Sequence, residues 1–256
     1  MIGRRHPSVV PRTRRRLRIV SGIAAAIMLA IFALFASAGF FDADAVHIVA
    51  PAGPRKPIGA VYFTGDMGVR FGMSADTIPA LAANGYPVYA INSPTLFAKR
   101  RTRAEVERIV ADAVRRGLEK TGSDRLVLIG QSYGADILQT GLAALPADLR
   151  AKVAGLVLVV PGETVYFRAD PSGIVYRGTP DSVAAETARR LTWLPFTCIY
   201  GTAETDSLCP QLVLPNIHVV AMPGGHFLDH DGTGLIAHVL RAIASATAPA
   251  PSKDRP

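Results

Sequence analysis

The feature that most constrains the fold of this chain is the stretch from Leu126 to Leu138, which reads LVLIGQSYGADIL. It begins with an apolar run rich in branched side chains, too short for a helix, which ends at Gly130. Apolar residues at helical spacing begin directly after Gly134. The stretch therefore predicts a strand, a sharp turn that contains Ser132, and a helix.

A Gly-x-Ser-x-Gly pattern in this setting is typical of the nucleophile elbow of the α/β-hydrolase fold. The serine of such an elbow occupies a strained turn, and the glycines leave room for the strand and helix backbones around it. Ser132 is therefore expected to project its hydroxyl above the carboxyl edge of a parallel sheet, at the positive end of a helix. The alternative is an ordinary turn of a Rossmann-like domain, but no Gly-x-Gly-x-x-Gly pattern follows the first predicted strand.

Strand-like and helix-like segments alternate on both sides of this turn, which predicts an α/β-hydrolase domain with a mostly parallel, doubly wound sheet. Apolar runs predict strands at 59–64, 86–91, 125–130, 153–160, 196–200 and 216–221. Amphipathic runs predict helices at 75–84, 102–120 and 235–246. We place the domain at 58–246, after a linker at 42–57 that has an edge strand at 46–50 as an option, and before a disordered tail at 247–256.

The formal charge of +8 is concentrated at the N-terminus. The first 18 residues hold seven arginines and no acidic residue, and the rest of the chain holds 21 basic and 20 acidic residues. Because the folded part is close to neutral, the charge argues against a nucleic-acid partner. Residues 1–18 are instead expected to be a basic cytoplasmic tail.

The uncharged stretch 19–41 is long enough to cross a bilayer. The preceding arginines keep the N-terminus in the cytoplasm, so the domain is expected outside the inner membrane, in the periplasm of a bacterial envelope. We favour a retained signal anchor; cleavage at the small-residue site that ends in Ala38 is the alternative. In that oxidising compartment Cys198 and Cys209, the only cysteines, predict one disulfide, with two buried free thiols as the alternative.

A serine hydroxyl needs a base to remove its proton, and the base needs a group that orients it. In α/β-hydrolases the acid and then the histidine follow the serine along the chain. His226, in a glycine-rich turn after the last predicted strand, is the expected base, with His230 as its rival. For the acid we prefer Asp206 to Glu204, because it is shorter and lies closer to the second cysteine.

Two backbone N–H groups are expected to bind the oxyanion: that of Tyr133, and that of Asp66 or Met67 in the glycine-containing loop after the first predicted strand. The aperiodic segment 161–181 is interpreted as a lid or substrate loop, with an ordinary long loop as the alternative. Neither a metal nor a cofactor is expected.

With these residues in view, the chain resembles the VirJ and AcvB family of bacterial virulence proteins. The resemblance spans about 58–243 and rests on the motifs GQSYGAD, CIYG followed by ExDSLCP, and PGGH. It implies a periplasmic serine hydrolase, with Ser132, Asp206 and His226 as the triad, that releases lysine from aminoacylated phosphatidylglycerol. A cationic lysyl group requires an acidic contact, for which the candidates are Asp66, Asp136, Glu163 and Glu204; Asp136 also suits the first turn of a helix.

Two other functions fit the sequence. One is a non-catalytic envelope protein that contacts components of a secretion system, because the resemblance is to a family linked to type IV secretion. The other is a general periplasmic esterase for small acyl esters.

Overall fold

A seven-stranded sheet forms the centre of the structure, a computed structural model that describes residues 12–248. The strand order is β1-β3-β2-β4-β5-β8-β9, and every neighbouring pair is parallel except β1 with β3. The strands are β1 Val46–Val49, β2 Ile58–Phe63, β3 Val88–Ile91, β4 Arg125–Gln131, β5 Val153–Val159, β8 Phe196–Gly201 and β9 Ile217–Met222, with β6 Thr164–Val165 and β7 Ser182–Val183 paired separately. The predicted mostly parallel, doubly wound sheet is confirmed.

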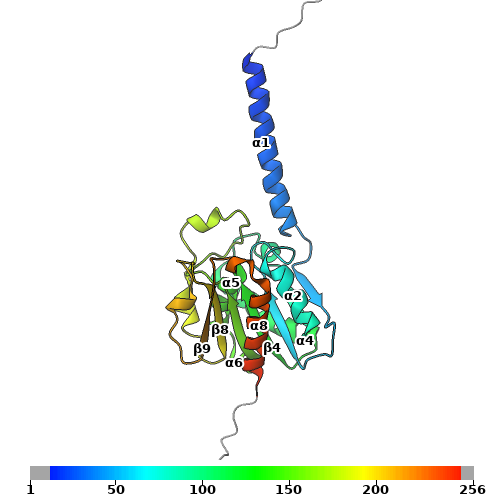
Figure 1. Cartoon of the computed structure of the whole chain (residues 1–256), viewed down its shortest axis with the longest axis vertical. Helices are drawn as coiled ribbons and strands as arrows, with labels where there is room; N and C mark the ends of the chain where they lie inside the picture. The colour runs from blue at the N-terminus through cyan, green and yellow to red at the C-terminus, as the bar shows by residue number, and fades with distance from the viewer. Residues whose placement is uncertain (1–11, 249–256) are drawn as a thin grey trace, which may run out of the picture.

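Helices cover both faces of this sheet (Figure 1). The helices are α1 Arg12–Ser37, α2 Met73–Ala83, α3 Ser93–Leu96, α4 Arg103–Thr121, α5 Tyr133–Leu142, α6 Ala147–Arg150, α7 Ala184–Ala188 and α8 Gly232–Thr247, and the 3-10 turns are η1 Val175–Arg177, η2 Cys209–Gln211 and η3 Leu228–His230. In β4, Leu126 and Leu128 belong to the core on the α4 and α5 side, and Val127 and Ile129 to the core on the α2 and α8 side. This two-sided burial explains why the strand reads as a continuous apolar run.

The segment between the N-terminal helix and the domain is more ordered than a linker. Residues 46–49 of the expected linker form β1, which pairs antiparallel with β3 at one edge of the sheet. Before it, Ala38 and Gly39 turn away from α1 and are buried against the domain. The chain therefore enters the domain through packed residues.

Helix α1 projects from the domain (Figure 1); it is exposed over residues 14–33 and partly buried over its last four residues, 34–37. Its Arg14–Ser37 portion has 24 residues and contains an 18-residue stretch with a mean hydropathy of 2.6, so it is long and apolar enough to cross a membrane. Most of the expected basic tail and of the C-terminal tail lies outside the described residues.

Candidate active site

The turn between β4 and α5 has the geometry of a nucleophile elbow. Ser132 adopts φ 51° and ψ −126°, a conformation that L-residues rarely adopt. A Cβ added at Gly130 would lie 2.6 Å from Ala135 Cα, and one at Gly134 would lie 2.6 Å from the carbonyl carbon of Phe63. Both motif glycines are therefore required by the close approach of the backbones around the serine.

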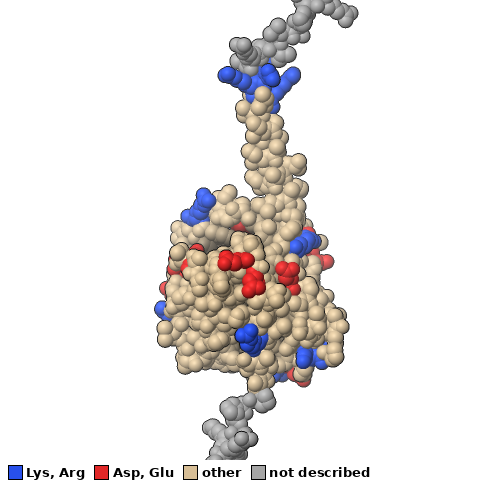
Figure 2. Space-filling model, viewed as in Figure 1, with Lys and Arg blue, Asp and Glu red and all other residues tan. Residues whose placement is uncertain are grey.

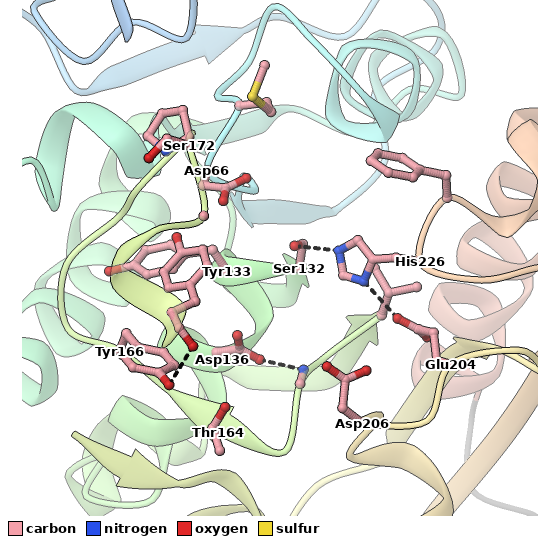
Figure 3. Close-up of a pocket in the computed structure, with 17 residues that line it drawn as sticks. Asp66, Ser132, Tyr133, Asp136, Thr164, Tyr166, Ser172, Glu204, Asp206 and His226 are labelled. Carbon is pink, nitrogen blue, oxygen red and sulfur yellow. Dashed lines mark hydrogen bonds and ion pairs between the residues drawn. The ribbon is translucent and has the colours of Figure 1, made fainter. Parts of the chain in front are cut away.

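Three side chains from three strand ends form one chain of hydrogen bonds (Figure 3). Ser132 Oγ lies 2.8 Å from His226 Nε2, and His226 Nδ1 lies 2.7 Å from Glu204 Oε1. They follow β4, β9 and β8 respectively. Because these strands are parallel, their carboxyl ends meet at one edge of the sheet, which brings together residues that lie 94 and 22 positions apart.

The carboxylate on His226 is Glu204, which corrects the expectation for Asp206. The loop after β8 turns back at once, so that the Gly201 N–H donates to Glu204 Oε2 at 3.0 Å while the other oxygen faces the imidazole. Asp206 lies further along the loop and is exposed; its backbone oxygen accepts from the Glu163 N–H at 2.8 Å. The greater length of the glutamate is what allows it to bind its own loop and the histidine together.

The turn that presents His226 is tightly folded. Three consecutive residues, Leu228, Asp229 and His230, have φ between 49° and 60°, and Gly224 has φ 91°. The Ala203 N–H donates to Gly224 O at 2.8 Å, which joins this turn to the loop of Glu204. His230, the alternative base, stacks on Phe227 and lines a neighbouring hollow instead of facing Ser132.

The expected oxyanion donors surround the serine. Asp66, Met67 and Tyr133 all line the same pocket as Ser132, and a Cβ added at Gly65 would lie 3.5 Å from Ser132 Cβ. Within residues 12–248, the N–H groups of Tyr133 and Met67 donate no hydrogen bond to the protein. They are thus available to an oxygen that develops negative charge beside Ser132.

The pocket beside the serine has a volume of about 430 Å³. Segment 161–181 contributes to its wall, in particular through the aromatic rings of Tyr166 and Tyr176, which the sequence did not single out. Tyr176 stacks on Tyr133, with ring centroids 6.2 Å apart, and the Tyr166 hydroxyl donates to Tyr176 O at 2.8 Å. The sequence feature that could have identified these two tyrosines is the aromatic content of the aperiodic segment after β5.

Four carboxylates line this pocket, and among its described lining residues there is no lysine or arginine. They are Asp66, Asp136, Glu204 and Asp206. Burial raises the pKa of Asp136 well above its usual value, and nearby Asp66 adds to the rise; the Gly162 N–H, which donates to Asp136 Oδ1 at 2.8 Å, acts in the opposite direction. Burial also raises the pKa of Asp66, opposed by the Tyr176 hydroxyl and by His226. The site is therefore acidic, and the carboxyls of Asp66 and Asp136 resist ionisation.

The remaining predicted residues are placed as follows. Glu163 does not line the pocket and accepts from Gln211 Nε2 at 3.0 Å, so it is not positioned with the other acidic candidates. Cys198 and Cys209 form the predicted disulfide, which is confirmed and closes the loop that carries Glu204. In the described part of the chain, no group of three His, Cys, Asp or Glu side chains is placed to hold a metal ion.

Comparison with solved structures agrees with this fold. The chain is similar in structure to the esterase Est1E from Butyrivibrio proteoclasticus, with a TM-score of 0.55 and 14% identity over 78% of this chain and 94% of the other. It is also similar to a lipase-esterase related protein from Clostridium acetobutylicum, with a TM-score of 0.58 and 13% identity over 77% and 99% of the two chains. An α/β serine hydrolase homologue from Coxiella burnetii gives 0.54 and 19% over 77% and 89%. These likenesses show an α/β-hydrolase fold.

The sequence comparisons identify the family. No curated protein matches the chain significantly. The family described as bacterial virulence protein (VirJ) matches residues 58–247 of the 256. The chain therefore belongs to the VirJ family of bacterial virulence proteins.

Proposed function

We propose that this protein is a serine hydrolase that cleaves an ester through an acyl-enzyme. The observation that carries the proposal is the unbroken hydrogen-bonded chain of Ser132, His226 and Glu204. His226 Nε2 takes the proton of the serine hydroxyl as Oγ attacks the ester carbonyl, and later gives that proton to the leaving alcohol. Glu204 holds the imidazole with Nε2 facing the serine and stabilises the imidazolium.

The charge that develops on the carbonyl oxygen is bound by the N–H of Tyr133 and an N–H of the 65–68 loop. Removal of a single side-chain oxyanion donor from a serine hydrolase costs about 3–4 kcal/mol of transition-state stabilisation, which sets the scale for each of these N–H groups. Water then attacks the acyl-enzyme by the same route, with His226 as the base, and releases the free acid. The full cycle needs only the groups that the pocket already contains.

For the substrate we propose aminoacyl-phosphatidylglycerol, and lysyl-phosphatidylglycerol in particular. The support is the acidic pocket: Asp136 and Asp66 lie beside Ser132 with no lysine or arginine among the described lining residues. An ammonium group beside Asp136 would favour its ionised form and offset the effect of burial on its pKa. An uncharged acyl group offers no such compensation, so the pocket favours a cationic one.

For the location we propose the inner membrane, with α1 as a retained anchor and the hydrolase domain in the periplasm. The apolar composition and length of α1, the arginines at and before its N-terminal end and the disulfide in the domain support this arrangement. A lipid substrate would then be present in the membrane that holds the enzyme.

The test uses the purified full chain with Ser132→Ala as the comparison. We expect the wild type to react with a fluorophosphonate at Ser132 and to release lysine from lysyl-phosphatidylglycerol in mixed micelles, and the variant to do neither. Equal lysine release by both proteins would remove the enzymatic assignment and favour an accessory role in secretion. Circular dichroism and the thermal midpoint check that the variant folds.

Substrate class is tested separately with Asp136→Asn, an isosteric change that retains an acceptor for the Gly162 N–H. We expect kcat/KM to fall for lysyl-phosphatidylglycerol but not for a neutral p-nitrophenyl ester. The exposed Asp148→Asn on α6 is the matched control. Equal losses on both substrates would contradict a cation-binding role and leave a general esterase.

A further inference from the structure

The end of α1 is joined to the loop that lines the active site. The Thr95 hydroxyl donates to Gly39 O at 2.5 Å and accepts from Asn92 Nδ2 at 2.7 Å. The other atom of the same amide, Asn92 Oδ1, accepts from the Val69 N–H at 3.0 Å. Asn92 is fully buried, so one rigid side chain connects the residues that follow α1 with the residues that follow Met67.

Two further contacts reinforce this junction. Arg70, from the same loop, forms an ion pair with Asp42 at 2.7 Å and extends toward Ser37 O at 3.5 Å. Gly68 has φ 73°, and a Cβ there would collide with Ala38 O. The 65–70 loop and the C-terminal end of α1 are therefore in direct contact, and no flexible segment separates them.

The length of α1 leaves no spacer between a bilayer and the domain. Its uncharged helical part, Ile19 to Ser37, is about 28 Å long, against about 30 Å for a hydrocarbon core. The aromatic rings of Phe32 and Phe41 stack at this end of the helix, 5.3 Å apart, and both are exposed. When α1 spans the bilayer, the lipid headgroups reach the domain.

The pocket wall lies on the same side of the domain as this helix end. Figure 1 shows segment 161–181, in yellow-green, rising beside the base of α1. Ile174 of this segment is 67% exposed, although it is a large apolar residue. Arg168 and Arg177 of this segment are exposed as well, and Figure 2 shows basic side chains over it. An exposed apolar side chain in a segment that also carries exposed arginines suits insertion among anionic lipid headgroups.

We propose that the rigid junction between α1 and the 65–70 loop holds the mouth of the pocket against the lipid leaflet that contains α1, with Ile174 inserted at the headgroup level. The occupant of this face is an anionic phospholipid surface. The inference rests on α1 being a retained anchor, as in the proposed function. Its consequence is that the enzyme draws its ester from its own membrane, without extracting the lipid into water.

The test measures how deeply position 174 lies in a lipid bilayer, and it does not require enzymatic activity. The full chain carrying Ile174→Cys is labelled with an environment-sensitive bimane and reconstituted into phosphatidylglycerol vesicles that contain brominated lipid, which quenches on contact. The native cysteines are paired in the disulfide, so the label is specific. Lys152→Cys is the control: Lys152 is exposed and directly precedes β5, at the amino ends of the parallel strands, whereas the active site lies at their carboxyl ends.

We expect at least threefold stronger quenching at position 174 than at position 152. Eight Gly and Ser residues inserted between Ser37 and Ala38 should reduce quenching at 174 toward that at 152, whereas the same insertion after Ala248 should not. Equal quenching at the two positions, or quenching at 174 that survives the first insertion, overturns the proposal. Hydrolysis of a soluble ester by the same proteins tests the proposed function independently, since neither result depends on the other.

Discussion

At the scale of single residues, side-chain length decides which acid serves the histidine. Glu204 and Asp206 lie two positions apart in one loop, and both line the pocket. Only Glu204 bonds its own loop through the Gly201 N–H and His226 through its second oxygen, with its side chain 5% exposed. Position along the chain could not distinguish the two acids, because the choice depends on how sharply the loop turns after β8.

We expect Glu204→Gln to lower turnover of a neutral ester on the order of 10⁴-fold, because an amide that donates to Nδ1 selects the wrong imidazole tautomer. Asp206→Asn should leave turnover of that ester close to the wild-type value, since its side chain does not contact the histidine. Stopped-flow hydrolysis and the rate of fluorophosphonate labelling measure both. The reverse order of effects would restore Asp206 as the orienting acid.

Asp136 should make the protein less stable as pH rises. Its pKa is raised in the folded state by burial, so between the unfolded value near 4 and the folded value the native protein binds the extra proton and unfolding becomes easier with increasing pH. Asp136→Asn removes this effect and should raise the thermal midpoint at pH 8, with the gain vanishing toward pH 4. Calorimetry at several pH values measures it; in a domain of this size 1 kcal/mol corresponds to about 2–4 °C.

The control for that series is Asp148→Asn, whose carboxylate is exposed. It should follow the wild-type midpoint at every pH. A pH-independent difference between wild type and Asp136→Asn would show that the substitution acts through packing instead of through the buried charge.

At the scale of elements, the strands and the nucleophile turn could be predicted because their signals are local. Buried parallel strands read as apolar runs, and the collisions at Gly130 and Gly134 leave glycine as the residue that fits. The role of residues 38–49 could not be predicted. The Thr95 hydroxyl donates to Gly39 O, and the Asn92 side chain packs against Gly39. The burial of Gly39 therefore depends on residues that lie 53 or more positions away in the chain. Proline and glycine content alone made that segment look like a linker.

The disulfide should stabilise the loop between β8 and η2. Closing a loop of this length contributes about 2–3 kcal/mol, and the loop carries Glu204. Reduction of the wild type should therefore lower the thermal midpoint by roughly 5–10 °C and slow fluorophosphonate labelling. The Cys198→Ala, Cys209→Ala double variant should lose more stability, because both cysteines are fully buried and their sulfur atoms also fill the core.

Because the reduced wild-type protein keeps both sulfur atoms, its thermal midpoint reports the loss of the cross-link alone, whereas the midpoint of the double variant also reports lost packing. An unchanged midpoint on reduction, with alkylation confirming that the thiols are free, would contradict a stabilising role for the bond.

At the scale of the whole molecule, the placement of charge, helix and disulfide supports the proposed orientation. The arginines lie on the N-terminal side of α1, and the disulfide lies in the domain on its C-terminal side. Positive residues flanking a spanning helix stay in the cytoplasm, and disulfides persist outside it. The two features are independent, and both support the proposed location of the domain beyond the membrane.

The orientation makes a prediction for living bacteria. Alkaline phosphatase fused after the C-terminus should be active, and green fluorescent protein at the same point should be dark after export through the general secretory route. The full chain should remain in the membrane fraction with its intact mass, and a maleimide added after denaturation without reductant should label no thiol. A soluble periplasmic form beginning at Gly39 would instead establish cleavage of the helix. In that case α1 could no longer hold the pocket at the lipid surface. The hydrogen-bonded serine, histidine and glutamate would remain intact. The proposed location and the proposed hydrolase activity can therefore be contradicted separately.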